Sequence, residues 1–414
     1  MNLSLTAQLM ATGLLAALLP FAVVLGVRDD GRYRKLVAVT LFLTFDLIVF
    51  GGYTRLTDSG LGCPDWPGCY GQANPFQAHA DISAAQTAMP SGPVTVTKAW
   101  IEMIHRYLAM AVGVLIVALM VTAWWRWWRL RRDRFAEVAA TSATSASVSA
   151  PSDSPWLPTF LFGFVCLQGA FGAWTVTLKL QPIIVTTHLL LGLSLLGLLT
   201  WLKARQDGPT RPVHGTGGTA DSGRAGLQQI AALRWPARLA LLLLALQLAL
   251  GGWVSTNYAT LACTDFPLCH GQLIPEMDYV HGFTLWRQLG MTAGGEYLPF
   301  SALTAIHWTH RNFAFVVIAV LGWVGWRARQ APALQRNGTW LLGAICLQFA
   351  TGVATIYLQW PLALAVAHNA GAALLVLVLT MLNYQTVAAA RLTRAGVLRT
   401  ALPAGQAFTI PAKQ

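Results

Sequence analysis

Long apolar stretches separated by short polar connections make up most of this chain. A helix needs about 20 predominantly apolar residues to cross the hydrocarbon core of a bilayer. Nine stretches of about this length occur, and they predict nine membrane-spanning helices. The stretches cover residues 8–27, 36–53, 99–125, 156–178, 183–203, 233–255, 302–326, 338–358 and 361–388.

Lys and Arg gather in alternate connections between these stretches. The basic segments are residues 28–35, 124–134, 203–238 and 327–336, and a tail that contains Arg391 and Arg394. Cytoplasmic loops of membrane proteins carry an excess of Lys and Arg, so we expect these segments to be cytoplasmic. The remaining connections then face outward. Basic residues follow the first stretch and none precede it, which predicts an uncleaved helix with its N-terminus outside.

Composition adds to this prediction and excludes one class of function. Of the 414 residues, 55% are hydrophobic and 11% are charged, which is far from the composition of a soluble domain. The net charge of +12 could suggest a nucleic-acid-binding protein, but here the basic residues flank apolar stretches. We therefore expect membrane lipid around the chain and no nucleic acid.

The two halves of the chain repeat each other. The segment "GLGCPDWPGCYGQ" matches "TLACTDFPLCHGQ" at a constant offset of 200 residues, which aligns Cys63 with Cys263 and Cys69 with Cys269. Both segments lie in connections predicted to face outward. The repeat predicts that both halves build the same kind of outer loop.

Each half also contains two histidines within apolar stretches. Aligning "IEMIHR" with "AIHWTHR" pairs His105 with His310, and aligning "TTHLLLG" with "VAHNAGA" pairs His188 with His368. Each half is thus a copy of a four-helix unit. Because four is an even number, both copies have the same orientation and are related by an axis along the membrane normal.

The predicted fold is an all-α integral membrane protein with two repeated four-helix transmembrane bundles and an extra N-terminal transmembrane helix. The predicted parts are the extra helix with its basic loop (1–35), the first bundle (36–205), a cytoplasmic linker (206–232), the second bundle (233–390) and a cytoplasmic tail (391–414).

The paired histidines indicate two haem sites. Ionisable groups inside a membrane are costly and mark functional sites. Two imidazoles at a similar depth on facing helices are suited to be axial ligands of a haem iron. A hydrogen-bonded structural histidine is the alternative for any one of them, and zinc would need further nitrogen, sulfur or oxygen ligands nearby.

The two copies differ one helical turn before the first histidine. Glu102 stands there in the first copy and His307 in the second. Residues three apart share a helix face, so each lies beside its haem site. A buried carboxylate at one site only predicts chemistry in the first copy and electron transfer in the second. A structural hydrogen bond from Glu102 to a neighbouring helix is the alternative.

These motifs together resemble the haem A synthase family, most closely proteobacterial members with cysteines in both outer loops. The resemblance covers residues 36–390 and rests on "GGYTRLTDSGLGCPDWPGCYG", "EMIHR" and the later histidines. It implies an eight-helix core. It also implies oxidation of the C8 methyl group of haem O to the formyl group of haem A, by successive hydroxylations, for aa3-type terminal oxidases.

Residue by residue, the resemblance implies two haem sites with different roles. Glu102, His105 and His188 match the family's substrate-haem site, whereas His310 and His368 match its resident haem b site. The expected setting is the bacterial inner membrane, with periplasmic cysteine loops. Expected partners are haem O as substrate, haem O synthase (protohaem farnesyltransferase), oxidase assembly factors and an unidentified electron donor or acceptor.

Two arginines and six cysteines complete the candidate residues. Arg106 and Arg311 either pair with haem propionates or extend to the membrane interface. A disulfide within each outer loop, Cys63 with Cys69 and Cys263 with Cys269, is expected on the oxidising side, in a structural or a redox-active role. The cysteines within helices, Cys166 and Cys346, are expected to be packing residues.

Two other classes of function remain open from the residues alone. A non-enzymatic dihaem electron-transfer protein of the b type would have two equivalent haem sites, which the difference between Glu102 and His307 disfavours. A transporter built on a parallel repeat would use the buried histidines to move protons and would contain no haem.

Overall fold

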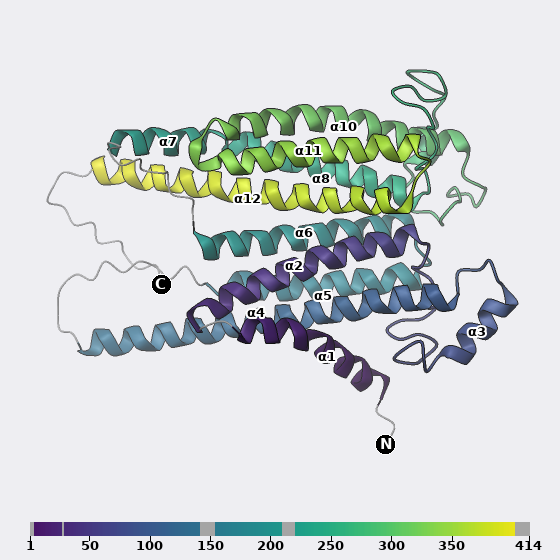
Figure 1. Cartoon of the computed structure of the whole chain (residues 1–414), viewed down its shortest axis with the longest axis horizontal. Helices are drawn as coiled ribbons and strands as arrows, with labels where there is room; N and C mark the ends of the chain where they lie inside the picture. The colour runs from purple at the N-terminus through teal and green to yellow at the C-terminus, as the bar shows by residue number, and fades with distance from the viewer. Residues whose placement is uncertain (1–3, 27–28, 141–153, 209–219, 402–414) are drawn as a thin grey trace.

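The computed structural model describes residues 4–26, 29–140, 154–208 and 220–401, and these are helical apart from the outer loops and short connections. The long helices run side by side (Figure 1). The helices are α1 (Leu5–Leu25), α2 (Asp29–Leu56), α3 (His79–Ala88), α4 (Val96–Ala140), α5 (Trp156–Thr177), α6 (Pro182–Asp207), α7 (Ala220–Ala232), α8 (Arg234–Thr256), α9 (Tyr279–Gly282), α10 (Phe300–Arg329), α11 (Gln335–Tyr357) and α12 (Leu362–Ala401).

Eight helices among the described residues are long and apolar enough to cross a membrane. They are α1, α2, α4, α5, α6, α8, α11 and α12. The ninth predicted span corresponds to α10, which is 30 residues long but carries His307, His310 and Arg311 in its outer part. It packs between α8 and α11 in the second bundle (Figure 1). The chain is an all-α, multi-pass membrane protein, as predicted.

The helices form two bundles with one extra helix. The first bundle contains α2, α4, α5 and α6, and the second contains α8, α10, α11 and α12. The extra helix α1 packs along α4, where a Cβ added at Gly13 would lie 3.0 Å from the Cβ of Met110. The two bundles meet where α2 and α6 contact α8 and α12 (Figure 1).

Small residues allow close approach at the interface between the bundles. Lipid tails are as apolar as leucine, so close van der Waals packing rather than release of water holds such helices together. A Cβ added at Gly52 of α2 would lie 3.4 Å from the Cβ of Asn369 of α12. A Cβ at the repeat-related Gly252 of α8 would lie 3.1 Å from Leu189 of α6. Gly52 and its repeat copy Gly252 therefore allow close helix packing on both sides of the interface.

Contacts between repeat-related residues locate the axis that relates the two bundles. The guanidinium group of Arg55 donates a hydrogen bond of 2.7 Å to the carbonyl oxygen of Ser255, and the hydroxyl of Tyr258 donates one of 2.7 Å to Asp58. Each contact joins a residue to the position 200 residues later. A residue can touch its own repeat copy only near the symmetry axis, so the axis passes between the ends of α2 and α8.

Two predictions need correction, one about a connection and one about the two cysteines within helices. The linker predicted at 206–232 contains the helix α7, because Leu227, Ile230 and Ala231 share one face and pack onto the core beside α12. Cys166 and Cys346, expected to be packing residues, are instead exposed on the outer faces of α5 and α11.

Several predicted features lie outside the described residues. These are Arg28 of the first basic segment, residues 141–153 of the connection between the third and fourth predicted helices, residues 209–219 of the linker, and residues 402–414 of the tail.

Candidate functional site

In the first bundle, both candidate histidines lie against glycines of the neighbouring helices. His105 of α4 faces Gly51 of α2, where an added Cβ would lie 2.9 Å from its Cε1 atom. His188 of α6 faces Gly172 of α5, with a corresponding distance of 3.2 Å. The imidazoles are thus supplied by the second and fourth helices, and glycines on the first and third leave room for them.

The second bundle repeats this arrangement. A Cβ added at Gly251 of α8 would lie 2.9 Å from Cε1 of His310 on α10. A Cβ at Gly352 of α11 would lie 3.1 Å from Cε1 of His368 on α12. The constant offset of 200 residues also pairs Gly51 with Gly251, but nothing in the sequence connects these glycines with the histidines. In the structure, each of the four glycines packs against one imidazole.

A cavity of about 1600 Å³, including its open mouth, lies between the helices of the second bundle. His310 and His368 both line it, together with apolar side chains such as Leu321 and Ile345. Its two imidazoles and its apolar walls are the lining that a haem would require, with His310 and His368 as the residues that would hold it.

The chemistry of the ligand set also fits haem better than a bare metal ion. Among the described residues, no group of three or more His, Cys, Asp or Glu side chains is placed to hold a metal ion alone. A haem brings four nitrogens of its own and needs only two axial ligands. In the first bundle, Nδ1 of His105 and Nδ1 of His188 are buried without a hydrogen-bond partner in the described part of the chain. Such orphaned polar atoms are rare in buried sites unless a function requires them.

Glu102 connects the first histidine helix to the first cysteine loop. Its carboxylate is almost fully buried, with 4% of the residue exposed. It accepts a hydrogen bond of 2.8 Å from the backbone N–H of Cys63 and forms an ion pair of 2.5 Å with Arg106. Glu102 therefore lies one turn from His105 and also fastens the loop above it.

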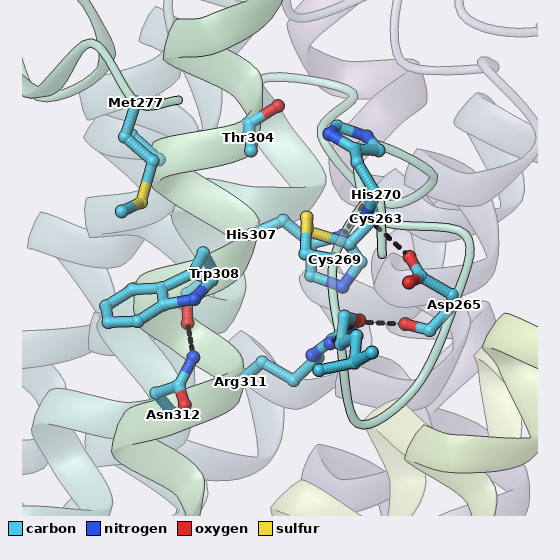
Figure 2. Close-up of a disulfide and its surroundings, with 12 residues drawn as sticks. Cys263, Asp265, Cys269, His270, Met277, Thr304, His307, Trp308, Arg311 and Asn312 are labelled. Atoms are coloured by element: carbon cyan, nitrogen blue, oxygen red, sulfur yellow. Dashed lines mark hydrogen bonds between the residues drawn. A yellow bond between two sulfur atoms is a disulfide. The ribbon is translucent and has the colours of Figure 1, made fainter. Parts of the chain in front are cut away.

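His307 takes the same structural position in the second bundle. The backbone N–H of Cys263 donates a hydrogen bond of 3.2 Å to Nδ1 of His307. Figure 2 shows the His307 ring directly beside the disulfide of this loop. The two copies thus anchor their loops through the same backbone amide but with different acceptors, a carboxylate in one and an imidazole in the other.

Arg106 holds the first loop through its carbonyl oxygens. Its guanidinium group donates to the carbonyl oxygens of Asp65 at 3.0 Å, Pro67 at 3.3 Å and Gly68 at 2.5 Å. Sequence reasoning considered haem propionates and the membrane interface as partners of this side chain. It missed the loop carbonyls because backbone acceptors have no sequence signature.

Arg311 makes the same contacts in the second loop. It donates to the carbonyl oxygens of Asp265 and Pro267, both at 2.8 Å, and to that of Leu268. Figure 2 shows Arg311 extending from its helix to the carbonyl oxygen of Asp265. The arginines of both copies therefore join the histidine helices to the loops that cover them.

Both expected disulfides are present, which confirms the predicted pairing of Cys63 with Cys69 and of Cys263 with Cys269. The loop turns back on itself directly after the second cysteine. In the second loop His270 and Gly271 both have positive φ angles of 53° and 74°, as a tight two-residue hairpin turn requires.

A carboxylate fixes each of these turns. Asp265 accepts hydrogen bonds from the backbone N–H groups of His270 at 2.8 Å and Gly271 at 2.9 Å, and Figure 2 shows the first of them. These donors, the one from Gly271 first, hold the pKa of Asp265 below its usual value. Asp65 makes the matching bonds to Tyr70 and Gly71 in the first loop.

Comparison with known proteins agrees with this architecture. The family model described as cytochrome oxidase assembly protein matches residues 34–380. The chain belongs to this family. The matched range includes every residue of the two sites described above, from Gly51 to His368.

Individual relatives within the family carry the name haem A synthase. One from Shewanella oneidensis is 36% identical over 350 residues, which is 84% of this chain and 95% of the relative. One from Caulobacter sp. (strain K31) is 29% identical over 82% of this chain and 92% of the relative. One from Bradyrhizobium sp. (strain ORS 278) is 27% identical over 92% and 98%.

Proposed function

We propose that this chain is a haem A synthase, which oxidises the C8 methyl group of haem O to the formyl group of haem A. The observation that carries the proposal is the pair of similarly built two-histidine sites with a carboxylate, Glu102, at only one of them. The name of the relatives supports the same activity. In this proposal His105 and His188 bind the substrate haem, and His310 and His368 bind haem b.

The residues of the first bundle provide positioning and a buried carboxyl group. When bound, a haem supplies an iron that can change oxidation state, which is chemistry no side chain here offers. His105 and His188 hold the macrocycle from opposite helices, and Gly51 and Gly172 leave the space for their rings. With water as the oxygen source, conversion of the methyl to the formyl group (R–CH3 + H2O → R–CHO + 4 H+ + 4 e−) releases protons at the site and electrons to an external acceptor. Glu102 stabilises positive charge there or accepts a proton at its carboxylate.

The contacts of Glu102 decide how this role has to be tested. Arg106 and the Cys63 amide both bind the carboxylate oxygens of Glu102. The same contacts anchor the loop, so a truncated side chain would lose the anchor together with the carboxyl group. In the second bundle, His307 accepts the matching hydrogen bond from the Cys263 amide without a carboxylate. A histidine at position 102 should therefore hold the loop and remove only the carboxyl group. Glu102→His is therefore the informative variant.

The wall between the two bundles supports electron transfer from one haem site to the other. Gly51 contacts His105, and the next residue, Gly52, contacts Asn369, which follows His368. On α2, Gly51 therefore faces the site of the first bundle and Gly52 faces that of the second. One layer of helices separates the sites, which suits a second haem that carries electrons.

The proposed setting follows the sequence prediction. The cysteine loops face the periplasm of a bacterial inner membrane, the C-terminus is cytoplasmic, and haem O arrives from haem O synthase. Oxidase assembly factors are proposed recipients of the product. The electron donor or acceptor has no assigned site.

Extraction of haem from the purified protein and mass analysis test this proposal. The protein is produced in cells that make haem O. Haem A or a hydroxylated haem O, together with haem b, is expected from the wild type. Haem b alone, at two molecules per chain, would contradict the synthase and support the dihaem electron-transfer protein. Protein without haem would support the transporter.

A further inference from the structure

The two bundles differ in a second way, which concerns the ring nitrogens of the candidate haem ligands. In the second bundle, Oγ1 of Thr351 lies 3.0 Å from Nδ1 of His368, and Nε2 of Gln247 lies 3.1 Å from Nδ1 of His310. In the first bundle, Nδ1 of both histidines has no partner among the described residues.

The contacts of Thr351 show which atom carries the proton. The Thr351 hydroxyl lies 2.9 Å from the carbonyl oxygen of Leu347, one turn earlier in α11, and donates its single proton to it. A hydroxyl has one donor and two acceptor positions, so Thr351 then accepts from His368. The proton of the His368 ring is thereby placed on Nδ1.

A second contact of the same ring leads to the same result. The side-chain amide Nε2 of Gln348 lies 3.2 Å from Nε2 of His368. An amide NH2 group is a donor only, so the ring nitrogen that faces it is an acceptor. Nε2 of His368 is therefore the unprotonated ring nitrogen, and it carries the lone pair that an iron ligand needs.

The first bundle lacks this hydrogen bond to Nδ1 because of its sequence. Repeat alignment of "CLQGAFG" with "CLQFATG" places Phe171 where the second bundle has Thr351. The ring of Phe171 packs against Trp174 at 5.0 Å between centroids and offers no acceptor to His188. Leu47 occupies the position of Gln247, but the amide nitrogen of Gln247 can only donate to Nδ1 of His310, so of the two contacts only that of Thr351 places a proton on Nδ1.

We propose that Thr351 is a positioning residue that fixes the tautomer and orientation of His368 and so makes the haem of the second bundle a resident cofactor. The first bundle, with Phe171 at this position, holds its haem through histidines that lack such support, as suits a substrate that has to leave. The inference rests on the proposed function, because it assigns haem b to the second bundle. Hydrogen bonds of this kind raise the basicity of a metal-bound imidazole, and their loss typically costs 10–100-fold in metal affinity.

The test compares three variants of the full-length protein in detergent. Thr351→Val keeps the shape and removes the hydroxyl, and Thr351→Ser keeps the hydroxyl. Thr355→Val is the matched control, because Thr355 lies one turn further along α11 and lines the cavity that contains His368, but its hydroxyl donates to the carbonyl oxygen of Gly352 and forms no hydrogen bond to a histidine in the described part of the chain. Haem b content per chain and the midpoint potential of haem b are measured for each.

Thr351→Val is expected to raise the midpoint potential, because a less basic imidazole stabilises ferric iron less, and to weaken haem b retention about 10–100-fold. Thr351→Ser and Thr355→Val are expected to match the wild type. If Thr351→Val keeps the wild-type potential and retention, the inference is wrong while the proposed function stands. A wild type without haem b in the second bundle would contradict the proposed function, and this inference with it.

Discussion

At the scale of single residues, the sites depend on small side chains as much as on ligands. Each candidate haem ligand rests against a glycine of a neighbouring helix, and the closest approaches occur at Gly51 and Gly251. An added Cβ at either position would lie closer to the imidazole than real Cβ atoms come to their neighbours. The ring would have to move, and with it the nitrogen that faces the haem.

Replacing these glycines should empty the two sites separately. Gly51→Ala is expected to displace His105 and reduce the amount of haem O or haem A bound, with haem b retained, and Gly251→Ala is expected to reduce haem b. Extraction and mass analysis of bound haems measure both effects. Gly113→Ala in α4 is the control, since an added Cβ there meets no atom within 4 Å. Equal haem content in all three variants would contradict the role of the glycines.

The candidate residues could be predicted from sequence where their type is costly in a membrane. Histidines in apolar stretches and the difference between Glu102 and His307 are visible in the repeat alignment. The roles of Arg106 and Thr351 could not be predicted, because their partners are a set of backbone carbonyls and one ring nitrogen. Such partners become apparent only when helices and loops are placed in space.

At the scale of elements, several independent interactions hold each cysteine loop in place. A disulfide closes it, a carboxylate fixes its turn, and an arginine from the histidine helix binds its carbonyl oxygens. The loop therefore stays attached to the helix that supplies the first histidine. We expect the order of the loop to depend on the charge of Asp265.

The pH dependence of the loop follows from the lowered pKa of Asp265. A carboxyl group whose pKa is lower in the folded than in the unfolded state stabilises the fold above its unfolded value, about 3.8 here. This stabilisation is lost as the pH falls through the lower, folded value. Hydrogen exchange at the Gly271 amide, measured by mass spectrometry, should therefore show more frequent opening of the turn in acid than above pH 4, after correction for intrinsic exchange rates.

Asp265→Asn is the control for this prediction. The amide has a similar shape but does not titrate, so the opening of the turn should lose its acid dependence. An unchanged acid dependence in the variant would show that another group is responsible.

The helices themselves were predicted better than the segments between them. Among the described residues, apolar length located all eight helices that are long and apolar enough to cross a membrane, and also α10, since a bilayer leaves few alternatives to a helix of about 20 residues. The helix α7 was missed because its segment begins in a Gly-rich sequence and its apolar face is short. The helix α3, in the first outer loop, was missed because only Ile82 is buried along it.

At the scale of the whole molecule, the two bundles are joined near the axis that relates them. Arg55 reaches from the first bundle to the carbonyl oxygen of Ser255 and stacks over the ring of Tyr258 at 4.2 Å. The side chain is only 16% exposed. Hydrogen bonds to charged groups contribute roughly 1.5–3 kcal/mol when they are buried.

Arg55→Met should loosen the contact between the bundles. We expect a loss of about 1–2 kcal/mol in the free energy of unfolding, measured by denaturant titration in detergent. Arg34→Met is the control, since Arg34 pairs with Asp207 within the first bundle and its side chain is 58% exposed. Exposed pairs contribute about 0–1 kcal/mol. Equal losses in the two variants would contradict a special role for Arg55.

The central claim concerns the whole molecule, because it assigns oxidation to one bundle and electron transfer to the other. The repeat makes the two bundles alike in helices, loops and histidines, so the assignment rests on the few positions where they differ. Glu102 is the difference that places a carboxylate one helical turn from His105. A variant that makes the first bundle resemble the second at this position tests the claim directly.

The most direct measurement is the haem composition of Glu102→His, produced in cells that make haem O and compared with the wild type. The imidazole can accept from the Cys63 amide as His307 accepts from Cys263, so the loop should stay anchored. We predict that the variant retains haem b and accumulates haem O without haem A. Formation of haem A at the wild-type level would contradict a role for Glu102 in the chemistry and the division of labour between the bundles.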